Sequence, residues 1–78
     1  MLFDFKEPQR ACIWMKDMNF SIDIIWLDQS KEIIKILENV NPDTYPESFC
    51  ADNTAYVVEL AASVAEQAGL RVGQQLKI

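Results

Sequence analysis

The sequence predicts a small α+β protein that is rich in β-structure. We expect a curved antiparallel sheet, or a half-barrel or sandwich, with one short helix near the C-terminus. Short apolar blocks and apolar–polar alternation, which are typical of strands, extend over most of the chain as far as Leu60. Helical spacing followed by a glycine occurs in one segment, Ser63 to Gly69. The length of 78 residues predicts a single domain over residues 1–78.

The N-terminal region predicts two strand segments and a turn. Leu2 to Phe5 alternates apolar and polar side chains. Ala11 to Met15 is apolar and aromatic, and it follows Pro8, which favours an extended entry. Lys16 to Asn19 is mostly polar and predicts a turn.

The clearest strand is Ile22 to Asp28. Its apolar side chains point alternately to both sides, so we expect both faces to be buried, with Trp26 in the core. Asp23 interrupts this apolar run, and a buried carboxylate there must be paired or hydrogen-bonded. Lys16 or a turn N–H is the expected partner. The polar residues from Asp28 to Lys31 reverse the chain into a strand from Glu32 to Val40, which predicts a hairpin.

The next segment, Asn41 to Asn53, is expected to be irregular because it contains two prolines and three acidic residues. Tyr45 and Phe49 are expected to hold it to the body of the protein. Ala55 to Leu60 then returns to strand alternation. Its side chains on one side are Tyr56, Val58 and Leu60.

The helix is predicted from Ser63 to Ala68. Ser63 and Glu66 fit a capping box, in which each side chain satisfies an unpaired backbone N–H of the first turn. Gly69 stands where a left-handed C-terminal cap is expected. Gly73 allows a tight turn, after which Gln74 to Ile78 predicts a short strand.

Composition and charge exclude several classes of function. There are 12 acidic and 7 basic residues, a net charge of −5, so nucleic acid and anionic membrane surfaces are not expected partners. The chain contains no His, which excludes a Ser-His-Asp triad and the usual zinc sites; we expect no metal and no cofactor. No signal peptide or membrane-spanning segment is recognisable, so we expect a soluble protein.

The two cysteines, Cys12 and Cys50, are interpreted as a small core residue and a loop thiol. The alternative is a disulfide, which would imply an oxidising compartment. Neither cysteine has a His available to activate it as a nucleophile.

Several segments, in this order, resemble the prokaryotic family called domain of unknown function 192. The segments are Met1 to Phe5, Ile13 to Asp17, Ile22 to Asp28, Glu38-Asn39 with Pro42, Tyr56 to Leu60, and Gly69 to Gly73. The resemblance covers nearly the whole chain. It implies a compact, antiparallel, β-rich fold with little helix, and it implies no particular activity.

The sequence departs from the family pattern in several places. Asp17 stands where Asn is usual, Ser21 where Pro is usual, Ala62 where Gly is frequent and Gln74 where Asp is frequent. Family members usually carry a further N-terminal segment with a strand and a helix. We therefore expect the chain to match the C-terminal two thirds of the family fold. The last sixteen residues are also similar to a corner of PDZ domains, but a PDZ domain needs an earlier glycine loop, and no glycine precedes Gly69.

One group of residues is the candidate site for a small polar ligand such as a sugar. It combines an aromatic platform with polar groups at a turn and on the neighbouring strands. The residues are Trp14, Lys16, Asp17, Asp23, Glu38 and Asn39. The alternative is a structural turn whose polar side chains bond to their own backbone, with Trp14 in the core.

The sequence thus favours a small binding or accessory module over an enzyme. The alternative is an interaction domain that self-associates as a homo-oligomer through an unpaired sheet edge. A hydrolase using Asp23 and Glu38 as a carboxylate pair is less favoured, because carboxylates on strands are usually solvated or paired. Calcium binding by Asp43, Glu47 and Asp52 is also less favoured, because their spacing does not match an EF-hand.

Overall fold

The computed structural model describes all residues 1–78 and contains one antiparallel sheet of four strands in the order β1-β4-β2-β3. The sheet is open, and one short α-helix lies near the C-terminus, which confirms the predicted fold class. The elements are β1 Leu2–Trp14, β2 Ile22–Leu27, β3 Ile33–Val40, the 3-10 helix η1 Pro42–Thr44, β4 Ser48–Ala61 and α1 Val64–Ala68.

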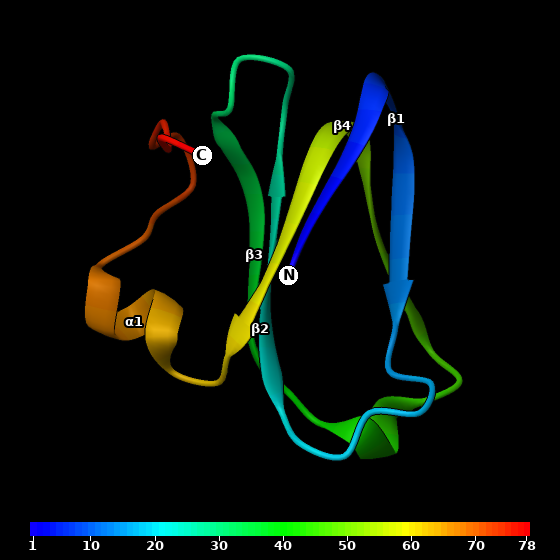
Figure 1. Ribbon diagram of the computed structural model, residues 1–78. Coiled ribbons are helices and arrows are strands. Elements are labelled where there is room, and N and C mark those ends of the chain that lie inside the picture. Colours follow the sequence, from blue (N-terminus) through cyan, green and yellow to red (C-terminus); the bar gives the residue numbers. More distant parts are fainter.

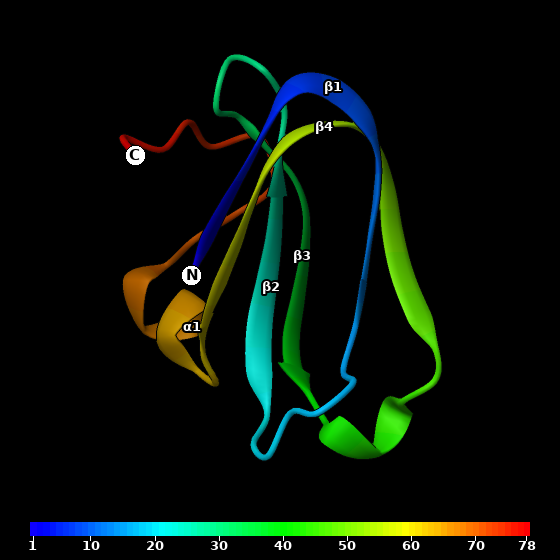
Figure 2. The same cartoon turned by 45° about the vertical axis from the view of Figure 1, so that its right-hand side comes forward.

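Strands β1 and β4 are long and bend together. Their register runs from Leu2 opposite Val58 to Trp14 opposite Ser48, with irregularities between Asp4 and Ala11. The backbone is left-handed at Lys6, with φ 69°. We call residues 11–14 of β1 and 48–51 of β4 the flap. As a result of the bend, the flap arches over one face of the β2–β3 hairpin (Figure 2).

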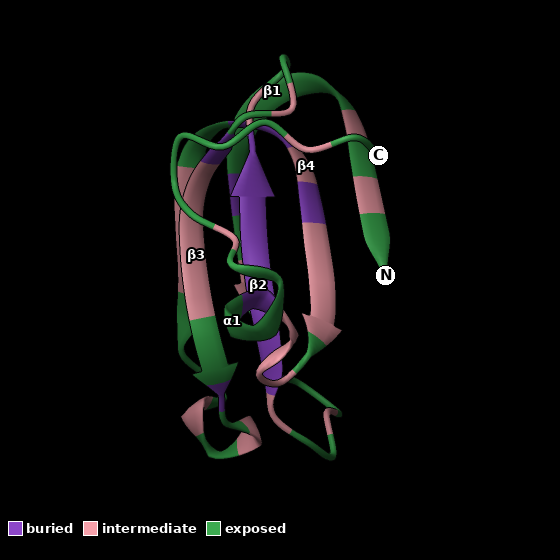
Figure 3. Ribbon diagram, turned by 90° about the vertical axis from the view of Figure 1, so that its left-hand side faces the viewer, coloured by how far each residue is buried: buried purple, intermediate pink, exposed green.

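The molecule therefore has three layers, with the β2–β3 hairpin between the flap and α1 (Figure 1). All six residues of β2 are buried, which confirms that both of its faces are covered (Figure 3). The flap-side core consists of Ala11, Met15, Ile22, Ile24, Trp26, Val40 and Val57. The helix-side core consists of Ile25, Leu27, Ile33 and Ala65. Tyr56, Val58 and Leu60, predicted to share one side of their strand, all pack against this core.

The β2–β3 hairpin is confirmed, and Asp28 holds its turn. The Asp28 Oδ1 accepts hydrogen bonds from the Ser30 N–H at 2.9 Å, the Ser30 hydroxyl at 2.7 Å and the Glu32 N–H at 3.0 Å. The Ser30 hydroxyl bond is the main reason that the Asp28 pKa lies below its ordinary value, with the backbone donors adding to it. An ionised Asp28 therefore stabilises the turn.

Two predictions about the strands were wrong. β1 is continuous through residues 6–10, where the sequence predicts a gap. The segment expected to be irregular as far as Asn53 becomes strand β4 at Ser48. Both differences depend on pairing between residues far apart in the sequence: Gln9 pairs with Thr54, and residues 48–51 pair with residues 11–14.

The helix forms where predicted, but its predicted capping box does not. Ser63 has a left-handed backbone, with φ 76°, and its side chain makes no capping hydrogen bond. Gly69 does close the helix in the left-handed conformation, as predicted. The predicted strand from Gln74 to Ile78 is reduced to a bridge between Gln75 and Glu32. No helix has the length and apolar character needed to cross a membrane.

The interpretation of the cysteines as free was also wrong, because Cys12 and Cys50 form a disulfide. The two residues lie directly opposite each other in the β1–β4 ladder. The sequence separation of 38 residues hides this register. Cys12 is exposed rather than in the core, and Cys50 lies on a strand rather than in a loop.

Candidate functional site

Asp23 is a fully buried carboxylate on β2. Its Oδ1 accepts a hydrogen bond from the Asn39 N–H, and its Oδ2 accepts one from the Ala65 N–H, each at 2.9 Å. The expectation that this carboxylate is hydrogen-bonded is therefore confirmed, although Lys16 is not its partner. Asp23 satisfies an N–H in the first turn of α1, a task that the sequence assigned to Ser63.

The same carboxylate fixes an irregular point of the sheet. Asn39 has a left-handed backbone, with φ 54°, and it lies where the β2–β3 register shifts. Its N–H points to Asp23 and not to a ladder partner. Asp23 thus ties the end of β3 and the start of α1 to the centre of the sheet.

A cluster of aromatic and polar side chains is exposed to solvent. Trp14 and Tyr45 are 49% and 42% exposed, and their ring centroids are 5.3 Å apart with the planes tilted by 54°. The Lys16 Nζ is 5.7 Å from the centroid of the Trp14 ring. We call Trp14, Lys16 and Tyr45 the aromatic site.

Local structure explains how these side chains come together. Trp14 is the last residue of β1, so its ring projects where the chain enters the next turn. Tyr45 follows η1, whose start is capped by the Asn41 side chain accepting from the Asp43 N–H at 2.8 Å. The loops that carry Lys16 and Tyr45 lie at the same end of the sheet (Figures 1 and 2).

The remaining candidate residues are distributed around this end of the sheet. Asp17 is exposed in the turn after Lys16 and has a left-handed backbone, with φ 62°. Glu38 and Asn39 are exposed near the end of β3. Asp23 is bound to α1, whereas its neighbours Ile22 and Ile24 belong to the flap-side core. The structure thus brings Trp14 and Lys16 together, and places Asp23 on the helix side.

Tyr45 was not among the candidate site residues, because we assigned it the structural role of holding the loop. The signal that could have found it is an aromatic residue between two prolines in a polar loop. Phe49, predicted to have the same anchoring role, does pack against the flap-side core.

An apolar hollow of about 370 Å³ lies near this end of the molecule. Six of its seven lining residues are hydrophobic, among them Met18 and Phe20. Its one acidic side chain is Glu59, and burial raises the pKa of that carboxyl above the ordinary value.

The protein is a small β-rich α+β protein. It has an open, bent antiparallel sheet with one short helix, two small cores and an exposed aromatic site. A family model described as "Uncharacterized ACR" matches residues 1–78. The chain therefore belongs to the DUF192 family, as its motifs indicated.

Two solved structures share the fold. One is a Sinorhizobium meliloti protein described provisionally as a transcription regulator. It is 31% identical to this chain, with a TM-score of 0.91, and the match covers 99% of this chain and 60% of the Sinorhizobium chain. The other is a protein of unknown function from Novosphingobium aromaticivorans. It is 26% identical, with a TM-score of 0.88, and the match covers 100% of this chain and 56% of the Novosphingobium chain. The chain thus spans less than two thirds of the length of either. A search of curated proteins found no match.

Proposed function

We propose that this chain is a small binding module that holds a small polar ligand of the sugar type against Trp14 and Tyr45. The observation that carries the proposal is the pair of exposed, mutually tilted rings with the Lys16 ammonium above one of them. Both aromatic side chains have an apolar body and a polar N–H or O–H, which suits a ligand that is partly apolar and partly hydroxylated.

A sugar ring matches this arrangement chemically. Its C–H face can pack on an aromatic ring, while its hydroxyls need hydrogen-bonding groups at the edge of that ring. Lys16, whose Nζ lies 5.7 Å from the centroid of the Trp14 ring, supplies donors, and the exposed Asp17 in the same turn offers acceptors. Glu38 and Asn39 are further exposed polar groups near the end of β3. In this proposal Asp23 supports the backbone of Asn39 and does not touch the ligand.

Nucleic acid is the main competing ligand. The Sinorhizobium relative is described provisionally as a transcription regulator, and nucleotide bases also stack on aromatic rings. However, phosphate binding needs clustered Lys and Arg, whereas this chain has a net charge of −5. We therefore favour an uncharged polar ligand.

The environments of the carboxylates favour binding over hydrolysis. Both oxygens of Asp23 accept backbone hydrogen bonds in a fully buried position, while Glu38 is exposed. Glycoside hydrolysis needs two carboxyl groups that both face the scissile bond. Asp23 is committed to holding the backbone, so we do not assign it the role of acid, base or nucleophile.

The test is equilibrium binding of the chain to a panel of mono- and disaccharides by isothermal titration calorimetry. Trp14→Ala and Tyr45→Ala should each weaken binding at least about tenfold, which corresponds to about 1.4 kcal/mol of lost contact energy. Phe20→Ala is the matched control, because Phe20 is an exposed aromatic side chain outside the aromatic site. Equal loss in all three variants, or no binding of any sugar, would reject the proposal.

A second candidate function is self-association through a sheet edge. It is favoured by the open sheet, in which β1 and β3 are the outer strands. The C-terminal segment covers only the start of β3, where Ile33 N–H donates to the Gln74 carbonyl at 2.8 Å. Sedimentation equilibrium is the test: a monomer throughout the micromolar range would count against this function.

A further inference from the structure

The Cys12–Cys50 disulfide lies on the solvent face of the flap. Along β1, Arg10, Cys12 and Trp14 are exposed, whereas the alternate residues Ala11 and Ile13 pack in the flap-side core. A strand directs successive side chains to opposite faces, so the sulfurs belong to the outer row. The crosslink is therefore open to attack from solution and is not sealed in the core.

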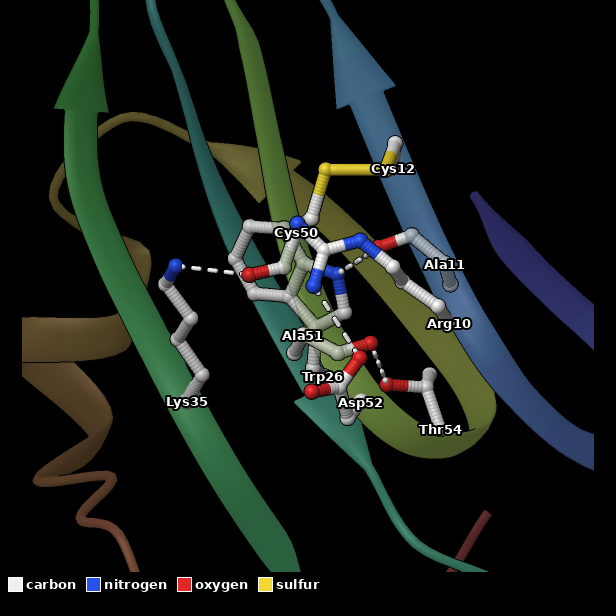
Figure 4. Close-up of polar contacts among 9 residues, drawn as sticks. All are labelled: Arg10, Ala11, Cys12, Trp26, Lys35, Cys50, Ala51, Asp52 and Thr54. Carbon is white, nitrogen blue, oxygen red and sulfur yellow. Dashed lines mark hydrogen bonds and ion pairs between the residues drawn. A yellow bond between two sulfur atoms is a disulfide. The ribbon is translucent and has the colours of Figure 1, made fainter.

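The same place is where the flap is attached to the rest of the sheet (Figure 4). The Trp26 Nε1–H donates to the Ala11 carbonyl at 3.0 Å, next to Cys12. The Lys35 Nζ donates to the Cys50 carbonyl at 2.8 Å and lies 5.3 Å from the centroid of the Trp26 ring. Both hydrogen bonds from the β2–β3 hairpin to the flap thus end on or beside a bridged cysteine.

We propose that Cys12–Cys50 is a thiol–disulfide exchange site that keeps the flap closed and that a small or protein dithiol can open. A thiolate of the dithiol attacks the sulfur of Cys12, the more exposed residue, and the Cys12–Cys50 bond breaks as the Cys50 thiolate leaves and takes up a proton. The second thiol of the reductant then displaces Cys12. The dithiol becomes a disulfide, and the protein gains two electrons and two protons as two thiols.

Exposure selects the sulfur that is attacked. Cys12 is exposed and Cys50 is only partly exposed, so attack at Cys12 is preferred and Cys50 is the leaving residue. The Lys35 Nζ holds the backbone carbonyl of Cys50, which ties this residue to the hairpin while the flap is closed.

Opening is expected to be local. The flap contributes to the flap-side core alone, and the helix-side core contains no flap residue. Trp14 lies two residues after Cys12 in the same outer row, so its ring moves with the flap. Reduction is therefore expected to displace Trp14 from Tyr45 and weaken ligand binding; this last consequence rests on the proposed function.

The test compares oxidised and dithiothreitol-reduced protein by hydrogen exchange and by sugar titration. In the reduced protein, amides of residues 11–14 and 48–51 should exchange at least tenfold faster, while amides of the β2–β3 hairpin keep their protection. Sugar affinity should fall at least tenfold. The Cys12→Ser, Cys50→Ser double variant should reproduce the reduced state and should not respond to the reductant.

Three results would overturn the proposal: a disulfide that survives millimolar dithiol in the native protein, flap exchange that is unchanged after reduction, or unfolding of the whole sheet on reduction. Because exchange is measured on wild-type protein, a double variant that fails to fold does not affect the test. If the oxidised protein binds no sugar, the proposed function fails, and the exchange rates still decide whether the disulfide holds the flap.

Discussion

Asp23 offers the sharpest test of how this fold is held together. In Asp23→Asn, the side chain keeps its shape but has one oxygen instead of two. Only one of the two backbone donors, Asn39 N–H or Ala65 N–H, can then keep its 2.9 Å bond. The other faces an amide NH2 group in a site that is completely buried.

The magnitude follows from these contacts. An unpaired buried N–H costs about 1–3 kcal/mol, and the surviving bond weakens by about 1 kcal/mol because its acceptor is no longer charged. The variant no longer buries a charge, which offsets part of this loss. We expect a net loss of about 2–3 kcal/mol, against a total stability of about 4–12 kcal/mol for a chain of this size.

Urea unfolding followed by tryptophan fluorescence and circular dichroism measures this loss directly. Asp43→Asn is the matched control, because Asp43 is exposed and its change should stay within about 0.5 kcal/mol. Sugar affinity should be nearly the same in both variants. A stability loss below about 1 kcal/mol for Asp23→Asn would refute the role of Asp23 as a tie between β3 and α1. A loss of sugar affinity without a loss of stability would instead mean that Asp23 binds the ligand.

Three further predictions test single features of the structure. Because the pKa of Glu59 is raised in the folded protein, stability is lost as the pH rises from the ordinary value of 4.5 through the folded value. Glu59→Gln should therefore raise the Tm at pH 7 and leave it unchanged near pH 3. The control Glu47→Gln should change the Tm at neither pH. The lowered pKa of Asp28 has the opposite sign: its stabilisation is complete above the ordinary value of 3.8 and is lost as the pH falls through the folded value. Asp28→Ala should therefore cost about 1 kcal/mol in urea unfolding at pH 7 and less near pH 2. Gly69→Ala should cost about 1 kcal/mol through backbone strain at φ 68°, because the added Cβ meets no atom; a loss above about 3 kcal/mol would contradict this explanation.

Features that depend on neighbours along the chain could be predicted from the sequence. The apolar alternation of β2 predicted burial on both faces, and Asp28 to Lys31 predicted the turn into β3. Gly69 predicted the left-handed end of α1, because few other residues adopt that backbone without strain. The family motifs led to the correct family from local segments alone.

Features that depend on contacts between distant segments could not be predicted in this way. Residues 48–53 form a strand because β1 lies beside them, although their own composition resembles a loop. The disulfide depends on the same register. The helix is capped by Asp23, which lies 42 residues before Ala65, so the local capping pattern of Ser63 was misleading.

The candidate site shows the same division. The proximity of Lys16 to Trp14 follows from their spacing at the end of a strand. Tyr45 joins them from the loop after β3, and only the fold of the whole chain brings it there.

The aromatic site can be tested most directly with the two indole N–H resonances of the protein, one for each tryptophan. The Trp26 N–H is buried and bonded to the Ala11 carbonyl, whereas Trp14 is about half exposed. In a heteronuclear NMR titration with the tightest-binding sugar of the panel, we predict that the Trp14 indole signal shifts in a saturable manner while the Trp26 signal stays in place. Saturable shifts confined to residues away from Trp14, Lys16 and Tyr45 would contradict the proposed binding site.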